Sequence, residues 1–236
     1  MTRWTQRVAA RFSRGAGTYD SASGLQADIA ARLAVLLPPR AEPILPPRAE
    51  RILEVGCGTG LFTRHLVARY GMGAVLPTDA APDMAARVPG ARVMNAGAPV
   101  LSGPFDLIAA CMVLHWLPEP LSLARLLAPG GALLYAAPTP GALAQWRDHL
   151  ERLDLPCGLI DFPDLPGAVE ERVHKVVYKD GITFLRSLAA TGATTPRPGY
   201  RPLPPGALLR AARAFDEEAQ RGVAWRIRYG RVTAAL

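Results

Sequence analysis

The chain has few cysteines and no long run of apolar residues. Cys57, Cys111 and Cys157 are odd in number, and none of them pairs with another at metal-ligand spacing, which indicates a reducing compartment and no metal site. No apolar run approaches the roughly 20 residues that a membrane-spanning helix needs. The N-terminal segment, Met-Thr-Arg-Trp-Thr-Gln-Arg, is too polar to resemble a signal peptide. We therefore expect a cytoplasmic protein that does not enter a membrane.

Lysine is almost absent, because 25 of the 27 basic residues are arginine. The net charge of +7 is unevenly placed: residues 1–36 hold five arginines against two acids, residues 197–236 hold eight against three, and the middle is near neutral. Two basic ends fit an acidic partner, although a general bias toward arginine explains the same pattern. The arginines are not interleaved with aromatic residues that stack on bases, so we do not expect nucleic-acid binding.

The most informative segment is Arg51-Ile-Leu-Glu-Val-Gly-Cys-Gly-Thr-Gly60. Its apolar residues predict a strand, its alternate glycines predict a tight loop, and residues 60–71 predict a helix. Such a loop brings bare backbone and a helix N-terminus close to a ligand. Asp79 follows at the expected end of the next strand, where a carboxylate accepts hydrogen bonds from ribose hydroxyls. We therefore predict that the chain binds a nucleoside.

The glycine spacing distinguishes between nucleoside cofactors. A dinucleotide-binding loop has the pattern G-x-G-x-x-G, which sets a pyrophosphate against the helix. Here the third glycine, Gly60, comes one residue earlier, and Glu54 stands two residues before the first. This E-x-G-x-G-x-G pattern resembles that of the S-adenosylmethionine (SAM) methyltransferases. The alternative is a glycine-rich turn in some other α/β protein, which does not account for the acid at position 79.

The pattern from residue 51 alternates between strands and helices. Strands are predicted at 51–56, 74–79, 91–95, 104–111 and 130–137, and helices at 60–71, 82–88 and 119–127. Two helices, at 3–14 and 23–36, precede this region, and residues 37–45 are nearly repeated at 45–53 without an assigned function. The alternation predicts an α/β fold with a Rossmann-like, doubly wound sheet that binds its ligand at the carboxyl ends of the strands.

The pattern changes after Pro138. The segments expected there are a helix near 141–153, a proline-rich loop at 155–166, a strand at 172–178, a helix between Asp180 as N-cap and Gly192 as C-cap, and a helix at 206–220. Val223, Trp225, Ile227 and Tyr229 then alternate with smaller or charged residues, which is typical of a half-buried strand. We expect one domain, with a helical cap and linker at 1–50, a cofactor-binding half at 51–137 and a substrate-side half at 138–236.

Five segments together resemble one branch of the SAM methyltransferases, the malonyl-acyl-carrier-protein O-methyltransferases of biotin synthesis. They are the glycine loop and residues 11–20 (RFSRGAGTYD), 105–116 (FDLIAACMVLHW), 184–193 (FLRSLAATGA) and 225–231 (WRIRYGR). The last two are far narrower signatures than the glycine loop. The resemblance implies the class I methyltransferase fold, mostly parallel with an antiparallel last strand, SAM as cofactor, and an acidic acyl carrier protein as substrate carrier.

The resemblance also implies which residues form the site. The cofactor-binding set is Glu54, Gly56, Cys57, Gly58, Gly60, Asp79, Ala80, Met84, Asn95, Ala96 and Cys111. Tyr19 closes over cofactor and substrate, or is an ordinary packed tyrosine. Arg186 binds the substrate carboxylate or merely pins its helix, and Arg147 is a weaker candidate for the same role. His115 is expected to be a wall of the pocket, and Trp116 a core residue.

Two segments depart from the family pattern. Asn95, in Val93-Met-Asn-Ala-Gly97, stands where the family usually has an acid that meets the adenine amino group, so only an uncharged carbonyl oxygen is offered. Residues 138–143 (PTPGAL) replace a different segment over the substrate. SAM binding is still expected, while the acceptor is less well defined.

Methyl transfer to a carboxylate requires no general base, because a carboxylate with a reference pKa near about 4 is already ionised at neutral pH. The lack of an obvious acid–base pair in the sequence is therefore expected. Two alternatives remain open: a methyltransferase acting on a free carboxylic acid or another small metabolite, and a non-methylating relative that serves as an assembly or hydroxylating factor on a protein.

Overall fold

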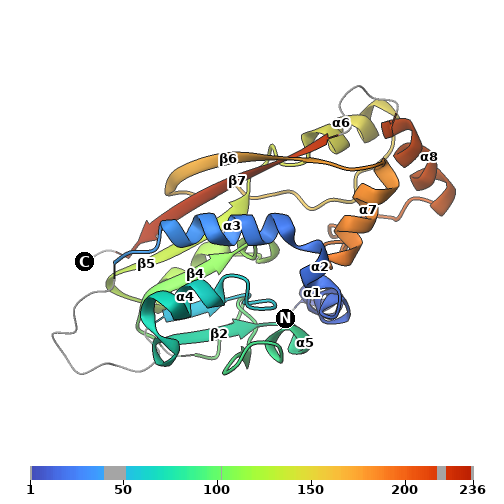
Figure 1. Ribbon diagram of the computed structural model, residues 1–236. Coiled ribbons are helices and arrows are strands. Elements are labelled where there is room, and N and C mark those ends of the chain that lie inside the picture. Colours follow the sequence, from blue (N-terminus) through green and yellow to red (C-terminus); the bar gives the residue numbers. More distant parts are fainter. Residues whose placement is uncertain (1, 40–51, 102, 217–221, 235–236) are drawn as a thin grey trace.

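A computed structural model of the chain describes residues 2–39, 52–101, 103–216 and 222–234. Seven strands of these residues form one sheet in the order β3-β2-β1-β4-β5-β7-β6 (Figure 1). They are β1 (Ile52–Val55), β2 (Val75–Asp79), β3 (Arg92–Val93), β4 (Phe105–Cys111), β5 (Leu127–Pro138), β6 (Ala168–Val177) and β7 (Gly222–Thr233). Strands β1 to β5 are parallel, and β7 runs antiparallel to both β5 and β6. The mostly parallel sheet with an antiparallel last strand is confirmed.

The helices cover the sheet and the carboxyl ends of its strands. They are α1 (Arg3–Gly15), α2 (Tyr19–Ala22), α3 (Gly24–Val35), α4 (Thr63–Tyr70), α5 (Pro82–Ala85), α6 (Ala144–Arg152), α7 (Gly181–Ala190) and α8 (Pro205–Asp216), with 3-10 helices η1 (Met72–Ala74), η2 (Leu114–Trp116) and η3 (Pro120–Leu126). Figure 1 shows α3 and α4 over one face, and α1, α2 and α5 beyond the carboxyl end of β2.

Side-chain alternation divides the strands between two hydrophobic cores. On β4, Leu107 and Ala109 belong to the core that contains buried residues of α3 and α4. Ile108 and Ala110 belong to the opposite core, with Leu123 of η3. Because successive residues of a strand point to opposite faces, an apolar run fills both cores at once. The unbroken apolar sequence of β4 therefore follows from its central place in the sheet.

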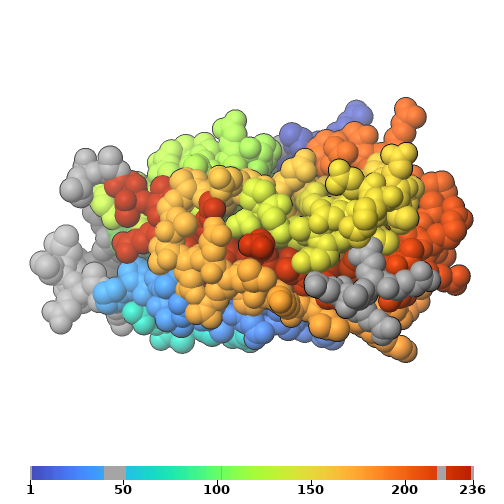
Figure 2. Space-filling model, turned by 90° about the horizontal axis from the view of Figure 1, so that it is seen from above, coloured from blue at the N-terminus to red at the C-terminus, as the bar shows by residue number. Residues whose placement is uncertain are grey.

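The outer strand β6 is protected by charge. Most of its residues are exposed, and Figure 2 shows it (light orange) on the surface beside α3 (blue). Glu170 pairs with Arg32 of α3 and with Arg172, while Glu171 pairs with Arg228 of β7. Charged side chains on an edge strand disfavour pairing with another chain.

The structure corrects several predicted boundaries. Helix α4 begins at residue 63 rather than 60, because the turns of the glycine loop continue to residue 62. The helix predicted at 82–88 is the short α5, the strand at 91–95 is only Arg92–Val93, and residues 120–126 form a 3-10 helix. Strand β6 begins at 168 rather than 172, and α8 is described only to 216. Most of the repeated segment 37–53, including Arg51, lies outside the described residues.

The predicted N-cap of α7, Asp180, is confirmed, whereas its C-cap is Thr191, one residue before the predicted Gly192. The Thr183 N–H donates to Asp180 Oδ1 at 2.6 Å, as an N-cap requires. Gly192 has a φ of +73° just after the helix, and the Ala193 N–H donates back to the Leu188 carbonyl at 3.0 Å.

Among the described residues, no helix combines the length and hydropathy that crossing a bilayer requires.

Candidate functional site

The glycine loop leaves β1 with three residues in the left-handed region. Gly56, Gly58 and Gly60 have φ values of +68°, +55° and +91°. A Cβ on Gly56 would lie 2.6 Å from Cγ2 of Val113, so only glycine fits this approach to the next loop. A Cβ on Gly58 would meet no atom within 4 Å. The loop is therefore packed tightly on one side and open on the other.

Asp79, at the end of β2, is held by this loop. The Gly58 N–H donates to Asp79 Oδ2 at 2.9 Å, and the Ala81 N–H donates to Oδ1 at 2.8 Å. Burial raises the pKa of Asp79, and these backbone hydrogen bonds oppose the rise. The carboxylate is thus fixed in orientation beside the open side of the loop.

These groups line a cavity of about 110 Å³, which we call the cofactor cavity. Of the predicted residues it brings together Gly56, Gly58, Asp79, Ala80, Met84, Asn95, Ala96, Cys111 and Tyr19. Phe12 and Trp116 also line it; neither was assigned to the cofactor from sequence. Cys57 lies instead at a smaller cavity of about 40 Å³ against the loop, which we call the loop cavity.

Glu54 and Gly60 line neither of these two cavities. Glu54 is buried, and its Oε2 has no hydrogen-bond partner among the described residues. Burial raises the pKa of Glu54 to about 8; the Thr63 hydroxyl opposes this rise, and the negative charge of Asp79 adds to it. Glu54 therefore lies within the base of the loop, and its predicted contact with the cofactor remains a prediction.

The side-chain oxygen of Asn95, which we predicted to accept a hydrogen bond from adenine, already accepts one within the protein. Its Oδ1 accepts a hydrogen bond from the Gly97 N–H at 3.1 Å. A carbonyl oxygen has a second lone pair, so Asn95 retains one acceptor site at the cavity wall.

Helices α1 and α2 form a roof that is tied to both halves of the site. Thr59 of the glycine loop donates to Asp20 at 2.5 Å. On the other side, Trp4 Nε1 donates to the Pro196 carbonyl at 2.8 Å. Tyr19 is the first residue of α2, and burial raises the pKa of its hydroxyl, as do the nearby Cys111 and Asp79. Tyr19 is therefore protonated at neutral pH.

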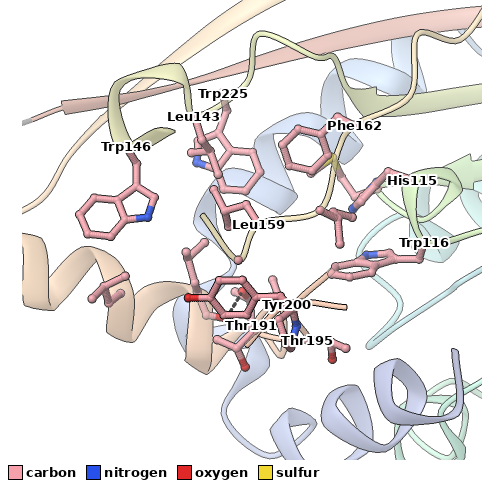
Figure 3. A pocket seen from close by; sticks show the side chains of 18 of the residues that line it. His115, Trp116, Leu143, Trp146, Leu159, Phe162, Thr191, Thr195, Tyr200 and Trp225 are labelled. Atoms are coloured by element: carbon pink, nitrogen blue, oxygen red, sulfur yellow. Dashed lines mark hydrogen bonds between the residues drawn. The ribbon is translucent and has the colours of Figure 1, made fainter. Parts of the chain in front are cut away.

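A second cavity of about 240 Å³ lies beneath the same roof, and we call it the acceptor cavity (Figure 3). Its wall is mostly apolar and includes Trp146, Phe162 and Trp225. Phe12, Tyr19, Met112 and Trp116 line both this cavity and the cofactor cavity. The two spaces therefore share one wall, to which Trp116, predicted as core, contributes from η2.

The arginines proposed for the substrate do not reach the acceptor cavity. Arg186 is exposed on α7, whose neighbouring residues Leu185 and Leu188 line the cavity instead. Arg147 is not part of the wall. It donates to the Ile160 carbonyl at 2.5 Å, and its guanidinium carbon lies 5.4 Å from the centre of the Phe162 ring. Arg186 therefore lies on the solvent-exposed side of α7. Arg147 instead stabilises the proline-rich loop through its hydrogen bond to Ile160.

His115 lies in the cavity wall, as expected. Its ring centre is 5.1 Å from that of Trp116 and 5.7 Å from that of Phe162. Burial lowers the pKa of His115 to about 3, so the ring is neutral. Burial raises the pKa of the Cys57 thiol, which argues against a nucleophile there.

The cofactor cavity fits an adenosyl group. Its lining combines open backbone at Gly58, an amide at Asn95 and the fixed carboxylate of Asp79, which suits the vicinal hydroxyls of a ribose. Of the described residues that line this cavity, none is a lysine or an arginine that could bind a pyrophosphate.

Comparison with known proteins agrees with this geometry. The family model described as "Methyltransferase domain" matches residues 22–167. The YcgJ protein of Bacillus subtilis has a similar fold, with a TM-score of 0.59 over 89% of this chain and 99% of that one, at 13% identity. The chain is a class I SAM-dependent methyltransferase.

Proteins of similar sequence indicate a narrower family within this class. A malonyl-[acyl-carrier protein] O-methyltransferase of Magnetococcus marinus is 32% identical over 78% of each chain. The biotin biosynthesis bifunctional protein BioCD of Bordetella avium is 33% identical over 89% of this chain, which spans about half (49%) of that longer protein. A trans-aconitate 2-methyltransferase of Methylobacterium nodulans is 40% identical over 48% of this chain and 43% of its own. The chain belongs to the malonyl-[acyl-carrier protein] O-methyltransferase family.

Proposed function

We propose that the protein transfers a methyl group from SAM to the free carboxylate of a malonyl group carried on acyl carrier protein, an early step of biotin synthesis. The names of its relatives support this acceptor. The observation that carries the proposal is that Phe12, Tyr19, Met112 and Trp116 line both cavities, because this sets a space for a cofactor directly beside a space for an acceptor. We place the reaction in the cytoplasm, since all three cysteines are free thiols.

The proposed reaction requires the protein to position the cofactor and the acceptor, and it requires no proton transfer. SAM supplies an electrophilic methyl group on a sulfonium. The acceptor carboxylate is already ionised, so the neutral His115 and the protonated Tyr19 do not need to act as bases. Excluding water and aligning the two groups can contribute roughly 7–11 kcal/mol in favourable cases. The apolar wall and the roof of α1 and α2 suit that task.

Within this proposal, each predicted residue has a limited role. Gly56, Gly58 and Asp79 hold the nucleoside, Asn95 faces the adenine, and Tyr19 covers the junction of the cavities. Arg186 is assigned to the surface, since it is exposed. We retain the proposed division into a cap at 1–50, a cofactor half at 51–137 and a substrate half at 138–236.

The basic surface near the acceptor cavity supports an acidic partner. Arg3, Arg7 and Arg11 are exposed on α1, and Arg197 and Arg201 are exposed on the loop that α1 contacts. Arg11 donates to Thr194, which lines the acceptor cavity. An acyl carrier protein is acidic, so its long-range attraction to this surface would raise the rate of encounter.

A second candidate acceptor is a free carboxylic acid. The similarity to a trans-aconitate methyltransferase over about half of the chain favours it. Both candidates require the same cofactor and differ only in what fills the acceptor cavity.

The test is incubation of the protein with methyl-labelled SAM and either malonyl-loaded carrier protein, carrier with a free prosthetic thiol, or trans-aconitate. We expect label only on the malonyl-loaded carrier. Label on trans-aconitate alone would replace the proposal by the second candidate, and label on none of them would refute both.

A further inference from the structure

The wall of the acceptor cavity carries no charge. Of the described residues that line it, none is Asp, Glu, Lys or Arg. Two of the described arginines contact wall residues without lining the cavity themselves. Arg147 lies against Phe162 and donates to the Ile160 carbonyl, and Arg11 donates to Thr194. His115 does not supply a charge either, because burial keeps its ring neutral.

The same wall carries unused hydrogen-bonding groups. Gln26 Oε1, His115 Nδ1, Thr195 Oγ1 and Trp225 Nε1 are buried and have no partner among the described residues, and all four residues line the acceptor cavity. Leaving a buried polar atom unpaired is unfavourable, so such atoms mark where a ligand's polar groups are expected. These groups are neutral, and three of them are able to donate a hydrogen bond to a carboxylate or a carbonyl oxygen.

A carboxylate in such a cavity needs a positive charge from elsewhere. Burying an ion without a counter-charge is strongly unfavourable, and neutral donors compensate only part of the cost. The cofactor cavity adjoins this one along Tyr19 and Trp116, and the charge it would supply is that of the sulfonium. The sulfonium can neutralise one carboxylate of an acceptor molecule. A second carboxylate on the same acceptor would lie against the apolar wall of the cavity without a positive charge beside it.

We propose that the acceptor cavity selects by charge: it accepts one carboxylate joined to an uncharged thioester tail and rejects free di- and tricarboxylates. This inference rests on the proposed function and narrows its substrate class. A carboxylate oxygen forms a bond to the methyl carbon as the sulfur–methyl bond breaks, and sulfur keeps the electron pair of that bond. Both charges disappear and no proton moves, so a low-dielectric wall favours the transition state over the separated ions.

Gln26 is the positioning residue for that carboxylate. It lines the acceptor cavity and also the loop cavity, which Gly56, Gly58 and Tyr19 line as well. The Gln26 side chain therefore lies where the acceptor cavity meets the loop cavity, on the side of the glycine loop. The two ends of an amide are interchangeable by a rotation of its last torsion, so the NH₂ group is able to face the carboxylate.

The first experiment compares acceptors with one, two and three carboxylates: S-malonyl pantetheine, free malonate and trans-aconitate. We expect methyl transfer to the thioester and rates lower by roughly a hundredfold or more for the two free acids. If malonate is methylated as fast as the thioester, the charge selection is wrong although the proposed function stands. If none of the three is methylated but the cofactor's charge still tightens acceptor binding in the second experiment, the proposed function is wrong although the charge selection stands.

The second experiment needs no turnover. Binding of S-malonyl pantetheine is followed by tryptophan fluorescence, since Trp116, Trp146 and Trp225 line the cavity. It is measured with sinefungin, which carries a protonated amine in place of the sulfonium methyl, and with the neutral S-adenosylhomocysteine. We expect about tenfold tighter binding with sinefungin. Equal affinities in the two complexes would overturn the proposal.

The third experiment isolates Gln26. Gln26→Glu places a negative charge at the junction and should weaken acceptor binding in the sinefungin complex by about tenfold or more, while Gln26→Met should weaken it less. Asp28→Asn changes an exposed residue of the same helix and serves as the matched control. Unchanged affinity for S-adenosylhomocysteine shows that each variant is folded, and wild-type acceptor binding by Gln26→Glu would refute the role of Gln26.

Discussion

Asp79 contributes both to the structure of the glycine loop and to the predicted binding of SAM. Its carboxylate orients the glycine loop through Gly58 and Ala81 and is the expected acceptor for the ribose. Asp79→Ala should therefore weaken SAM binding about 10- to 100-fold and also lower the free energy of unfolding by about 1–3 kcal/mol. Calorimetric titration and urea unfolding measure the two effects. Asp83→Ala, at an exposed residue nearby, is the control, and unchanged SAM affinity in Asp79→Ala would remove Asp79 from the site.

Under the proposed function, Tyr19 would donate a hydrogen bond from its hydroxyl to the acceptor, and this hydroxyl does not titrate near neutral pH. Tyr19→Phe should reduce turnover about tenfold through the loss of one hydrogen bond to a charged group, with SAM affinity close to wild type. Burial raises the pKa of Tyr19 and lowers that of His115 to about 3. Neither group changes its charge near neutrality, so neither Tyr19 nor His115 should make the rate depend on pH from about pH 6.5 to 9. A bell-shaped profile that disappears in Tyr19→Phe or in a His115 variant would show that the acceptor needs a base.

Glu54 makes the stability of the unliganded protein depend on pH. Its pKa is raised from 4.5 to about 8 in the folded protein by burial. Between these two values the folded state holds a proton that the unfolded chain has released, so stability falls as the pH rises through this window and is level above it. Glu54→Gln carries no ionisable group and should gain up to a few kcal/mol relative to wild type across the same window. Urea unfolding at a series of pH values tests this, and parallel curves for both proteins would contradict it.

At the scale of elements, the roof depends on close contact between α1 and the end of α7. Gly192 has a φ of +73°, and a Cβ there would lie 3.0 Å from Phe12. Gly192→Ala should destabilise the fold by about 1–3 kcal/mol and weaken binding in both cavities, because Phe12 lines both. Gly199→Ala is the matched control, since Gly199 has a φ of +76° and open space around it. Equal effects of the two changes on ligand affinity would mean that α1 does not shape the site.

Elements with strong periodicity were predictable, and those set by tertiary contacts were not. The apolar run of β4 and the alternation in β7 identify strands because each pattern reports its own burial. Residues 120–126 have a helical composition, but they form a 3-10 helix. This segment packs against both β4 and β5, and such tertiary contacts are not visible in the local sequence. In the site, the glycine loop and Asp79 were local signals. Gln26, Thr195 and Trp225 meet only through folding, so no local pattern identifies them.

At the scale of the molecule, charge should govern how a carrier arrives. Arg210 and Arg213 are exposed on α8, which also contributes Leu208 to the acceptor cavity. Replacing both by Ala should raise the KM for malonyl-loaded carrier several-fold, roughly as added salt does, through slower association. The KM for S-malonyl pantetheine should not change. If salt affects both substrates equally, the basic ends are not a docking surface.

In the proposed reaction, the methyl group ends on the malonyl carboxylate of a carrier-bound thioester. Intact-mass spectrometry of malonyl-loaded carrier, after incubation with SAM and the protein, tests it most directly. We predict that the carrier gains the mass of a single methylene and that mild alkaline cleavage of the thioester releases the monomethyl ester of malonate. An unchanged carrier mass, or the same gain on carrier that lacks the malonyl group, would contradict the account.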